Sequence, residues 1–128
     1  MWMLWMASKI RRRKKTSRGS DMRRGDICRV VKPQDDPKRY RCYVVVSRQE
    51  LIDSGYSSVV CAPIFTKGRG LSTQIAVGVD EGLKHESWIT CDNLRSIDKG
   101  NLTGFVGSLS PSKIDALDEA LRIALALD

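Results

Sequence analysis

From Asp26 onward, the sequence consists of short runs of β-branched and apolar residues that are separated by turn residues. This spacing is typical of a small domain built mainly from β-strands. The segment from Arg48 to Tyr56 suits a short helix or turn that ends at Gly55. We expect strands at Ile27–Lys32, Cys42–Ser47, Ser58–Ile64, Thr73–Val79 and Ser87–Cys91, and a weaker strand near Gly104–Val106.

The C-terminal segment has the clearest helical pattern in the chain. Its apolar side chains recur every three or four residues, which places them on one face of a helix. Ser110 is a suitable N-cap, and Pro111 suits the first helical turn. We therefore expect a mainly β fold (β plus α) in which an amphipathic C-terminal helix closes one side of the core. The apolar stripe consists of Ile114, Leu117, Leu121 and Leu125.

The 128 residues suit a single domain that is preceded by a basic extension. The net charge is +7, and the whole of this positive excess lies before Asp26. We expect residues 1–21 to form a disordered basic arm, of the kind that binds RNA, DNA or anionic membranes, and residues 22–128 to form the domain. Equally, the functional chain could begin near Met22. No apolar run suits a secretory signal or a membrane span, so we expect a cytoplasmic protein with no membrane contact.

Several familiar site types do not fit the sequence. Cys28, Cys42, Cys61 and Cys91 lack the C-x-x-C spacing of a structural zinc site, so we interpret them as buried apolar residues of a reducing compartment rather than as a disulfide or redox pair. Because no phosphate-binding or dinucleotide-binding glycine motif occurs, we expect no cofactor. His85 stands between charged residues and should be an exposed loop residue.

Basic side chains recur in the segments that we expect to be loops. The first such loop runs from Pro33 to Arg41, and Tyr40 within it offers a ring on which a base could stack. If these loops meet at one edge of a small barrel, they form a groove for a phosphodiester backbone. The alternative is a solvated basic rim without function. The basic residues are Lys38, Arg39, Arg41, Lys67, Arg69 and Arg95.

Five blocks of the sequence together resemble the MazF/PemK-type toxins of bacterial toxin–antitoxin systems. The resemblance implies an SH3-like β-barrel, a homodimer, a cognate antitoxin protein as partner, and cleavage of single-stranded RNA that needs no metal. The match runs from about Met22 to the C-terminus. The blocks are Arg24–Ile27, Arg41 with Tyr43–Ser47, Ala62–Thr66, Cys91–Lys99 and Gly107–Pro111.

The resemblance also implies which residues would perform catalysis. Arg41 matches the family's catalytic arginine, which would stabilise the charge that develops on phosphorus while the RNA's own 2′-hydroxyl attacks and leaves a 2′,3′-cyclic phosphate. The family's second catalytic position carries a hydroxyl, but here it holds Phe65. Thr66 can supply the hydroxyl only if the strand ends or bulges at Phe65, because successive strand residues point to opposite faces.

Phe65 and the altered first loop leave the activity open, and Asn93 is a milder departure from the family pattern. The first loop lacks the family's Gly-Ser-Glu segment, Cys42 replaces a proline and Asn93 replaces a glutamine. Besides an endoribonuclease, we therefore consider a catalytically inactive or gyrase-directed member that acts by binding a protein, and a non-enzymatic module that binds nucleic acid. For the endoribonuclease, we expect catalysis from Arg41 and Thr66 and RNA contacts from Lys38, Arg39, Tyr40, Ser47, Lys67, Arg69 and Arg95.

Overall fold

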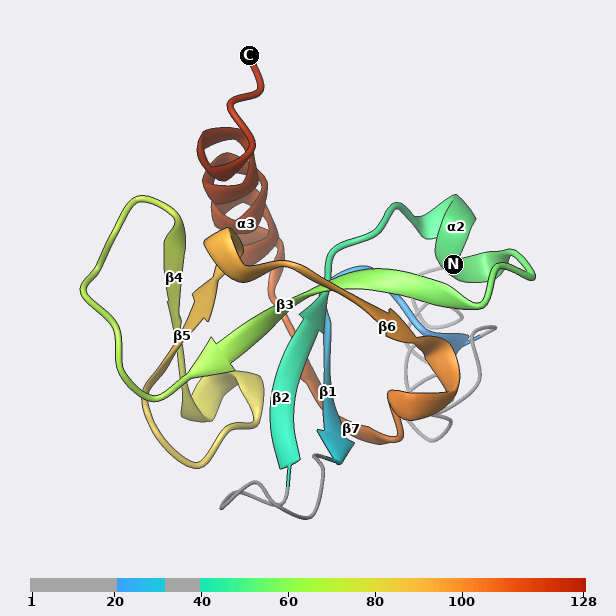
Figure 1. The fold of residues 1–128 in the computed structure, drawn as a ribbon. Helices are drawn as coiled ribbons and strands as arrows, with labels where there is room; N and C mark the ends of the chain where they lie inside the picture. Colours follow the sequence, from blue (N-terminus) through green and yellow to red (C-terminus); the bar gives the residue numbers. More distant parts are fainter. Residues whose placement is uncertain (1–20, 32–39) are drawn as a thin grey trace, which may run out of the picture.

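Antiparallel strand pairing organises the chain, as a computed structural model shows for residues 21–31 and 40–128 (Figure 1). Within these residues, seven strands form one curled sheet in the order β4-β5-β3-β2-β1-β7, and β6 pairs with β3 beside β5. The strands are β1 (Asp26–Val31), β2 (Tyr40–Val45), β3 (Ser58–Phe65), β4 (Gln74–Val77), β5 (Ser87–Thr90), β6 (Arg95–Asp98) and β7 (Gly104–Ser108).

The long strand β3 lies at the centre of the sheet and determines its curvature. Its N-terminal half, Ser58–Cys61, pairs with β6, and its last two residues pair with β5. Its other edge pairs with β2 through residues 61–63. Because β5 and β6 follow one another along the same edge of β3, the sheet divides into two parts that wrap around the interior, as in a small barrel.

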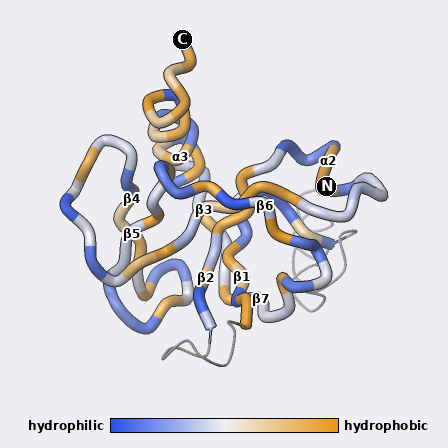
Figure 2. The backbone as a smooth tube through the Cα atoms, viewed as in Figure 1, coloured by the Kyte–Doolittle hydropathy of each residue, from blue (hydrophilic) through white to orange (hydrophobic). Residues whose placement is uncertain are grey.

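Buried side chains cover both faces of the central strands. Val44 belongs to one core cluster, together with Ile27 and Ile89, whereas its neighbours Tyr43 and Val45 belong to a second cluster on the other face. A strand that is buried on both faces carries a continuous apolar run rather than an alternating one. Figure 2 shows that β2 becomes hydrophilic toward its N-terminal end.

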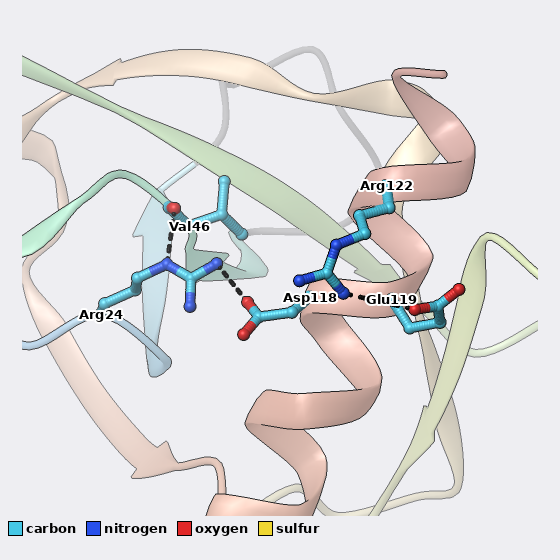
Figure 3. Close-up of polar contacts among 5 residues, drawn as sticks. All are labelled: Arg24, Val46, Asp118, Glu119 and Arg122. Atoms are coloured by element: carbon cyan, nitrogen blue, oxygen red, sulfur yellow. Dashed lines mark hydrogen bonds and ion pairs between the residues drawn. The ribbon is translucent and has the colours of Figure 1, made fainter. Parts of the chain in front are cut away.

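Helix α3 (Pro111–Ala124) covers one side of the first core cluster. The hydroxyl of Ser110 accepts a hydrogen bond from the backbone N–H of Lys113 at 3.3 Å, which confirms the expected N-cap. Leu117 is fully buried, and Arg24 ties the helix to the barrel (Figure 3). The Arg24 guanidinium donates to the Val46 carbonyl at 3.0 Å and lies 2.7 Å from a carboxylate oxygen of Asp118.

The remaining elements are short. Helix α2 (Gln49–Asp53) follows β2, and three 3₁₀ turns, η2 (Val79–Glu81), η3 (Cys91–Asn93) and η4 (Lys99–Asn101), flank the later strands. In the described part of the chain, no helix combines the length and the apolar character needed to cross a membrane.

The structure confirms the mainly β fold, the short helix after the second strand and the C-terminal helix. Several details differ from the sequence-based prediction. Tyr40 and Arg41, expected in the first loop, begin strand β2, because pairing with β1 extends to these residues. Leu125, expected in the apolar stripe of the helix, follows the last residue of α3 and is 51% exposed. Arg95 begins a strand, β6, which the prediction left as a loop, because the run RSID is too short and too polar to be recognised. Strand β4 is shorter than expected and ends at Val77. The expected basic arm of residues 1–21 lies almost wholly outside the described residues.

The four cysteines are free, and three of them are fully buried, as expected. Burial raises the pKa of the Cys28 and Cys61 thiols to about 12. Cys42 is only half-buried. These thiols therefore act as apolar core residues.

Candidate functional site

A cavity of about 410 Å³ opens where β2 begins and β3 ends. The two strands are antiparallel, so these ends meet at one edge of the sheet. The segment between η2 and β5 forms the opposite wall. The cavity is lined by Tyr40, Arg41, Cys42, Ile64, Thr66, Leu83, Lys84, His85 and Ser87.

Arg41 is held at this cavity by two contacts with the end of β3. Its Nη1 donates a hydrogen bond to the carbonyl oxygen of Ile64 at 3.4 Å, and its guanidinium carbon lies 4.4 Å from the centroid of the Phe65 ring. The half-buried side chain can still turn its other N–H groups toward the cavity. The alternative to a catalytic role for Arg41 is a surface ion pair with Asp35 or Asp36, and both of these residues lie outside the described residues.

Thr66 lies beside Arg41 because β3 ends one residue earlier. Phe65 is the last residue of the strand, and Thr66 follows in a bend with its side chain exposed. The strand alternation that would turn Thr66 away from the site thus stops at Phe65. The structure places Arg41 and Thr66 in the wall of one cavity. Their catalytic roles stay predictions.

Of the residues predicted to contact RNA, Tyr40 lines the same cavity as the two catalytic candidates, Arg41 and Thr66. Its side chain is 38% exposed, and the Arg29 guanidinium lies 5.3 Å from the centre of its ring. The Tyr40 ring is therefore partly accessible at the cavity. Lys38 and Arg39, which precede it in the sequence, lie outside the described residues.

The other predicted contact residues lie away from the cavity. Lys67 and Arg69 are exposed on the loop between β3 and β4, where the backbone N–H of Arg69 donates to the Gln74 side chain at 3.0 Å. Arg95 is exposed on β6, opposite Cys61, and thus beside the N-terminal half of β3. Ser47 is buried, and its hydroxyl accepts a hydrogen bond from the backbone N–H of Val60 at 2.7 Å, so it stabilises the strand connection.

The cavity also contains two residues that the sequence did not assign to a site. Lys84 and His85 are exposed, as expected for a loop, but they line the same cavity as Arg41 and Thr66. The sequence offered only a weak indication that Lys84 and His85 belong to a site, namely the charged run Lys84-His85-Glu86 before a strand. Cys42 completes the wall; burial raises its thiol pKa, while the nearby Arg29 and Arg41 lower it.

The cavity combines cations, a hydroxyl, an imidazole and a phenol ring around one opening. These groups can bind a phosphate, stabilise extra negative charge on it and hold an adjacent base. A second cavity of similar size, beside β4, is instead lined by three acidic residues, Asp80, Glu81 and Glu86, and one basic residue, Lys113, so its lining is less favourable to an anion. In the described ranges, no group of three or more His, Cys, Asp or Glu side chains could hold a metal ion.

Comparisons with known proteins agree with this arrangement. Residues 23–125 match the family model described as "PemK-like, MazF-like toxin of type II toxin-antitoxin system". "Endoribonuclease MazF3" from Mycobacterium tuberculosis is 35% identical over 85 residues, which cover 66% of this chain and 82% of that protein.

Two solved structures have the same fold. "Mycobacterium tuberculosis toxin MazF-mt6" is 31% identical, with a TM-score of 0.67 over 79% of this chain and 98% of the other. An "Endoribonuclease in complex with its cognate antitoxin from Mycobacterial species" has a TM-score of 0.70 over 82% of this chain and 95% of the other, and at 24% identity it shows the fold alone.

Proposed function

The chain belongs to the PemK-like, MazF-like toxins of type II toxin–antitoxin systems, and we propose that it is an endoribonuclease that cleaves single-stranded RNA. The observation that carries the proposal is the cavity whose lining includes both Arg41 and the exposed Thr66. A relative that matches most of the domain is named an endoribonuclease, which supports the same activity.

In the proposed reaction, the RNA itself supplies the nucleophile. The 2′-oxygen attacks the adjacent phosphorus and loses its proton, the bond from phosphorus to the 5′-oxygen breaks, and that oxygen gains a proton. The products are a 2′,3′-cyclic phosphate and a 5′-hydroxyl. Arginine is a poor proton acceptor, so Arg41 would act by binding the phosphate and stabilising the extra negative charge of the transition state. Thr66 would donate a further hydrogen bond. The mechanism needs no metal.

The surroundings of the cavity suit a single strand of RNA. Tyr40 lies at the cavity and can stack on a base, and Lys84 adds a cation on the opposite wall. The exposed Lys67 and Arg69 would contact the phosphates that extend beyond it. We also propose a homodimer, a cognate antitoxin protein as partner and a cytoplasmic location, as expected for a toxin of this family.

Removal of the Arg41 side chain tests the function directly. The purified protein is incubated with a long single-stranded RNA in excess EDTA, and the ends of the products are identified. Arg41→Ala should reduce the cleavage rate by about 100- to 1,000-fold, as for other preorganised donors that stabilise a transition state. Arg122→Ala is the matched control, because it removes an exposed arginine on α3 that pairs with Glu119.

Cleavage at a repeated short sequence that survives in Arg122→Ala but not in Arg41→Ala would support the proposal. Equal rates for Arg41→Ala and the wild type would contradict the role of Arg41. Intact RNA with a folded wild-type protein would contradict the endoribonuclease and favour a family member that acts by binding a protein.

A further inference from the structure

Phe65 occupies the position at which the resemblance led us to expect a hydroxyl, yet its ring lies against Arg41. We propose that Phe65 is a positioning residue that holds the Arg41 guanidinium toward the scissile phosphate. This inference rests on the function proposed above and adds to it the residue that orients the catalytic arginine.

The strand register brings the two side chains together. The pairing of β2 with β3 ends at Tyr43 and Pro63, and Arg41 and Phe65 each lie two residues beyond this last pair, on adjacent ends of the two strands. The guanidinium carbon lies 4.4 Å from the ring centroid, a distance typical of a stacked cation–π pair. The hydrogen bond from Arg41 to the Ile64 carbonyl is long, at 3.4 Å, and fixes one nitrogen only. The ring is therefore the second contact that restrains the guanidinium.

Phe65 is itself well placed to act as a fixed support. It is the last residue of β3, it is half-buried, and its backbone pairs with Trp88 of β5. The Trp88 ring in turn packs against the following loop so closely that a Cβ atom on Gly68 would lie 2.2 Å from it. The position of the Phe65 ring is thus determined by β3 and its neighbours, and not by a flexible loop.

An aromatic ring suits this task better than a carboxylate would. A carboxylate orients arginine by accepting hydrogen bonds from its N–H groups and by neutralising its positive charge. Phosphate binding requires that these N–H groups stay free and that the positive charge is kept. A ring instead contacts the flat face of the guanidinium, so the N–H groups, which lie in the plane, stay available. Phe65 therefore orients Arg41 and leaves its N–H groups available for the phosphate. The hydroxyl that the family carries at this position would be supplied by Thr66.

Two variants of Phe65 separate the stacking contact from simple packing. Phe65→Leu keeps an apolar side chain but removes the ring, and Phe65→Tyr keeps the ring. We expect Phe65→Leu to lower kcat for RNA cleavage by about 10- to 100-fold with little change in KM, because a misplaced catalytic group slows the chemical step. Phe65→Tyr should stay within about threefold of the wild type, and thermal unfolding of each variant reports whether the fold is retained.

The double variant shows whether Phe65 acts through Arg41. In an Arg41→Ala background, Phe65→Leu should cause no further loss of kcat, because the group that the ring positions is gone. A loss of equal size in both backgrounds would contradict a positioning role. Higher activity of Phe65→Leu would show that the ring restrains Arg41 away from the phosphate, and would also overturn the inference.

A spectroscopic measurement tests the contact without cleavage. In ¹H–¹⁵N NMR spectra of the wild-type protein, ring currents should shift the Arg41 side-chain N–H signals upfield, with the assignment made from their disappearance in Arg41→Ala. Unshifted signals would refute the stacked geometry even if Phe65→Leu failed to fold. Intact RNA with the wild type refutes the proposed function and this inference together, whereas equal cleavage by the wild type and a folded Phe65→Leu refutes this inference alone.

Discussion

Gly107 lies where β7 contacts η2, the 3₁₀ turn that precedes the cavity residues Lys84 and His85. Replacing Gly107 with alanine should destabilise the protein. An added Cβ atom would lie 2.1 Å from the carbonyl oxygen of Glu81, the last residue of η2. The approach is mutual, since a Cβ atom on Gly82, which has a φ of +93°, would lie 2.4 Å from the carbonyl oxygen of Val106. The two backbones thus pack directly against each other.

The size of the effect follows from these distances. Close contacts between carbon and carbonyl oxygen occur at about 3.3–3.6 Å, so β7 and η2 must separate by about 1 Å in Gly107→Ala. Overpacking of this kind costs about 1–3 kcal/mol, and we expect the upper end because both atoms that must move belong to the backbone. For a domain of this size, about 3 kcal/mol lowers Tm by roughly 10–20 °C.

Urea denaturation of Gly107→Ala beside Gly55→Ala provides the test. Gly55 has no atom within 4 Å of its would-be Cβ, so its substitution should change the free energy of unfolding by no more than about 1 kcal/mol. If Gly107→Ala unfolds within about 1 kcal/mol of the wild type with an unchanged m-value, the direct packing of β7 on η2 is wrong. A shift of η2 should also displace the adjoining Lys84 and His85, and slow RNA cleavage.

Two further predictions concern buried groups. Lys99 is 9% exposed, and its ammonium donates to the carbonyls of Leu51 at 3.1 Å and Ser54 at 2.8 Å, at the end of α2. Lys99→Met should lower the free energy of unfolding, measured by urea denaturation, by about 2–3 kcal/mol. If Lys99→Met is as stable as the wild type, these carbonyls need no donor. Burial, the largest cause, raises the pKa of the Cys28 and Cys61 thiols from 9.0 to about 12. The contribution of these thiols to the free energy of unfolding should therefore be fully present below pH 9 and decline from pH 9 to 12, because the unfolded chain there loses thiol protons that the folded chain keeps. Urea midpoints measured across this range provide the test. An equally steep decline in a Cys28→Ala variant would contradict the prediction.

The catalytic candidates were accessible from the sequence because they lie within blocks that resemble a known family. Arg41 begins a recognisable strand, and Thr66 closes a block with a central proline. Ser47 stands in an equally recognisable block, but its hydroxyl faces the interior and binds the Val60 N–H. A motif identifies the segment, whereas the direction of each side chain depends on where the strand ends and bends.

The sequence by itself determined the features that depend on neighbouring residues: the runs that form the main strands, the N-cap and apolar stripe of α3, and the membership of the family. These signals are local, since turn residues, capping groups and apolar periodicity act within a few positions of the chain. Only the tertiary structure decided that β6 pairs with β3, that Lys84 and His85 line the same cavity as Arg41, and that the Phe65 ring lies against the Arg41 guanidinium. These relations arise when the curled sheet brings together residues that are distant in sequence, and their geometry depends on strand register and curvature, which no local pattern specifies.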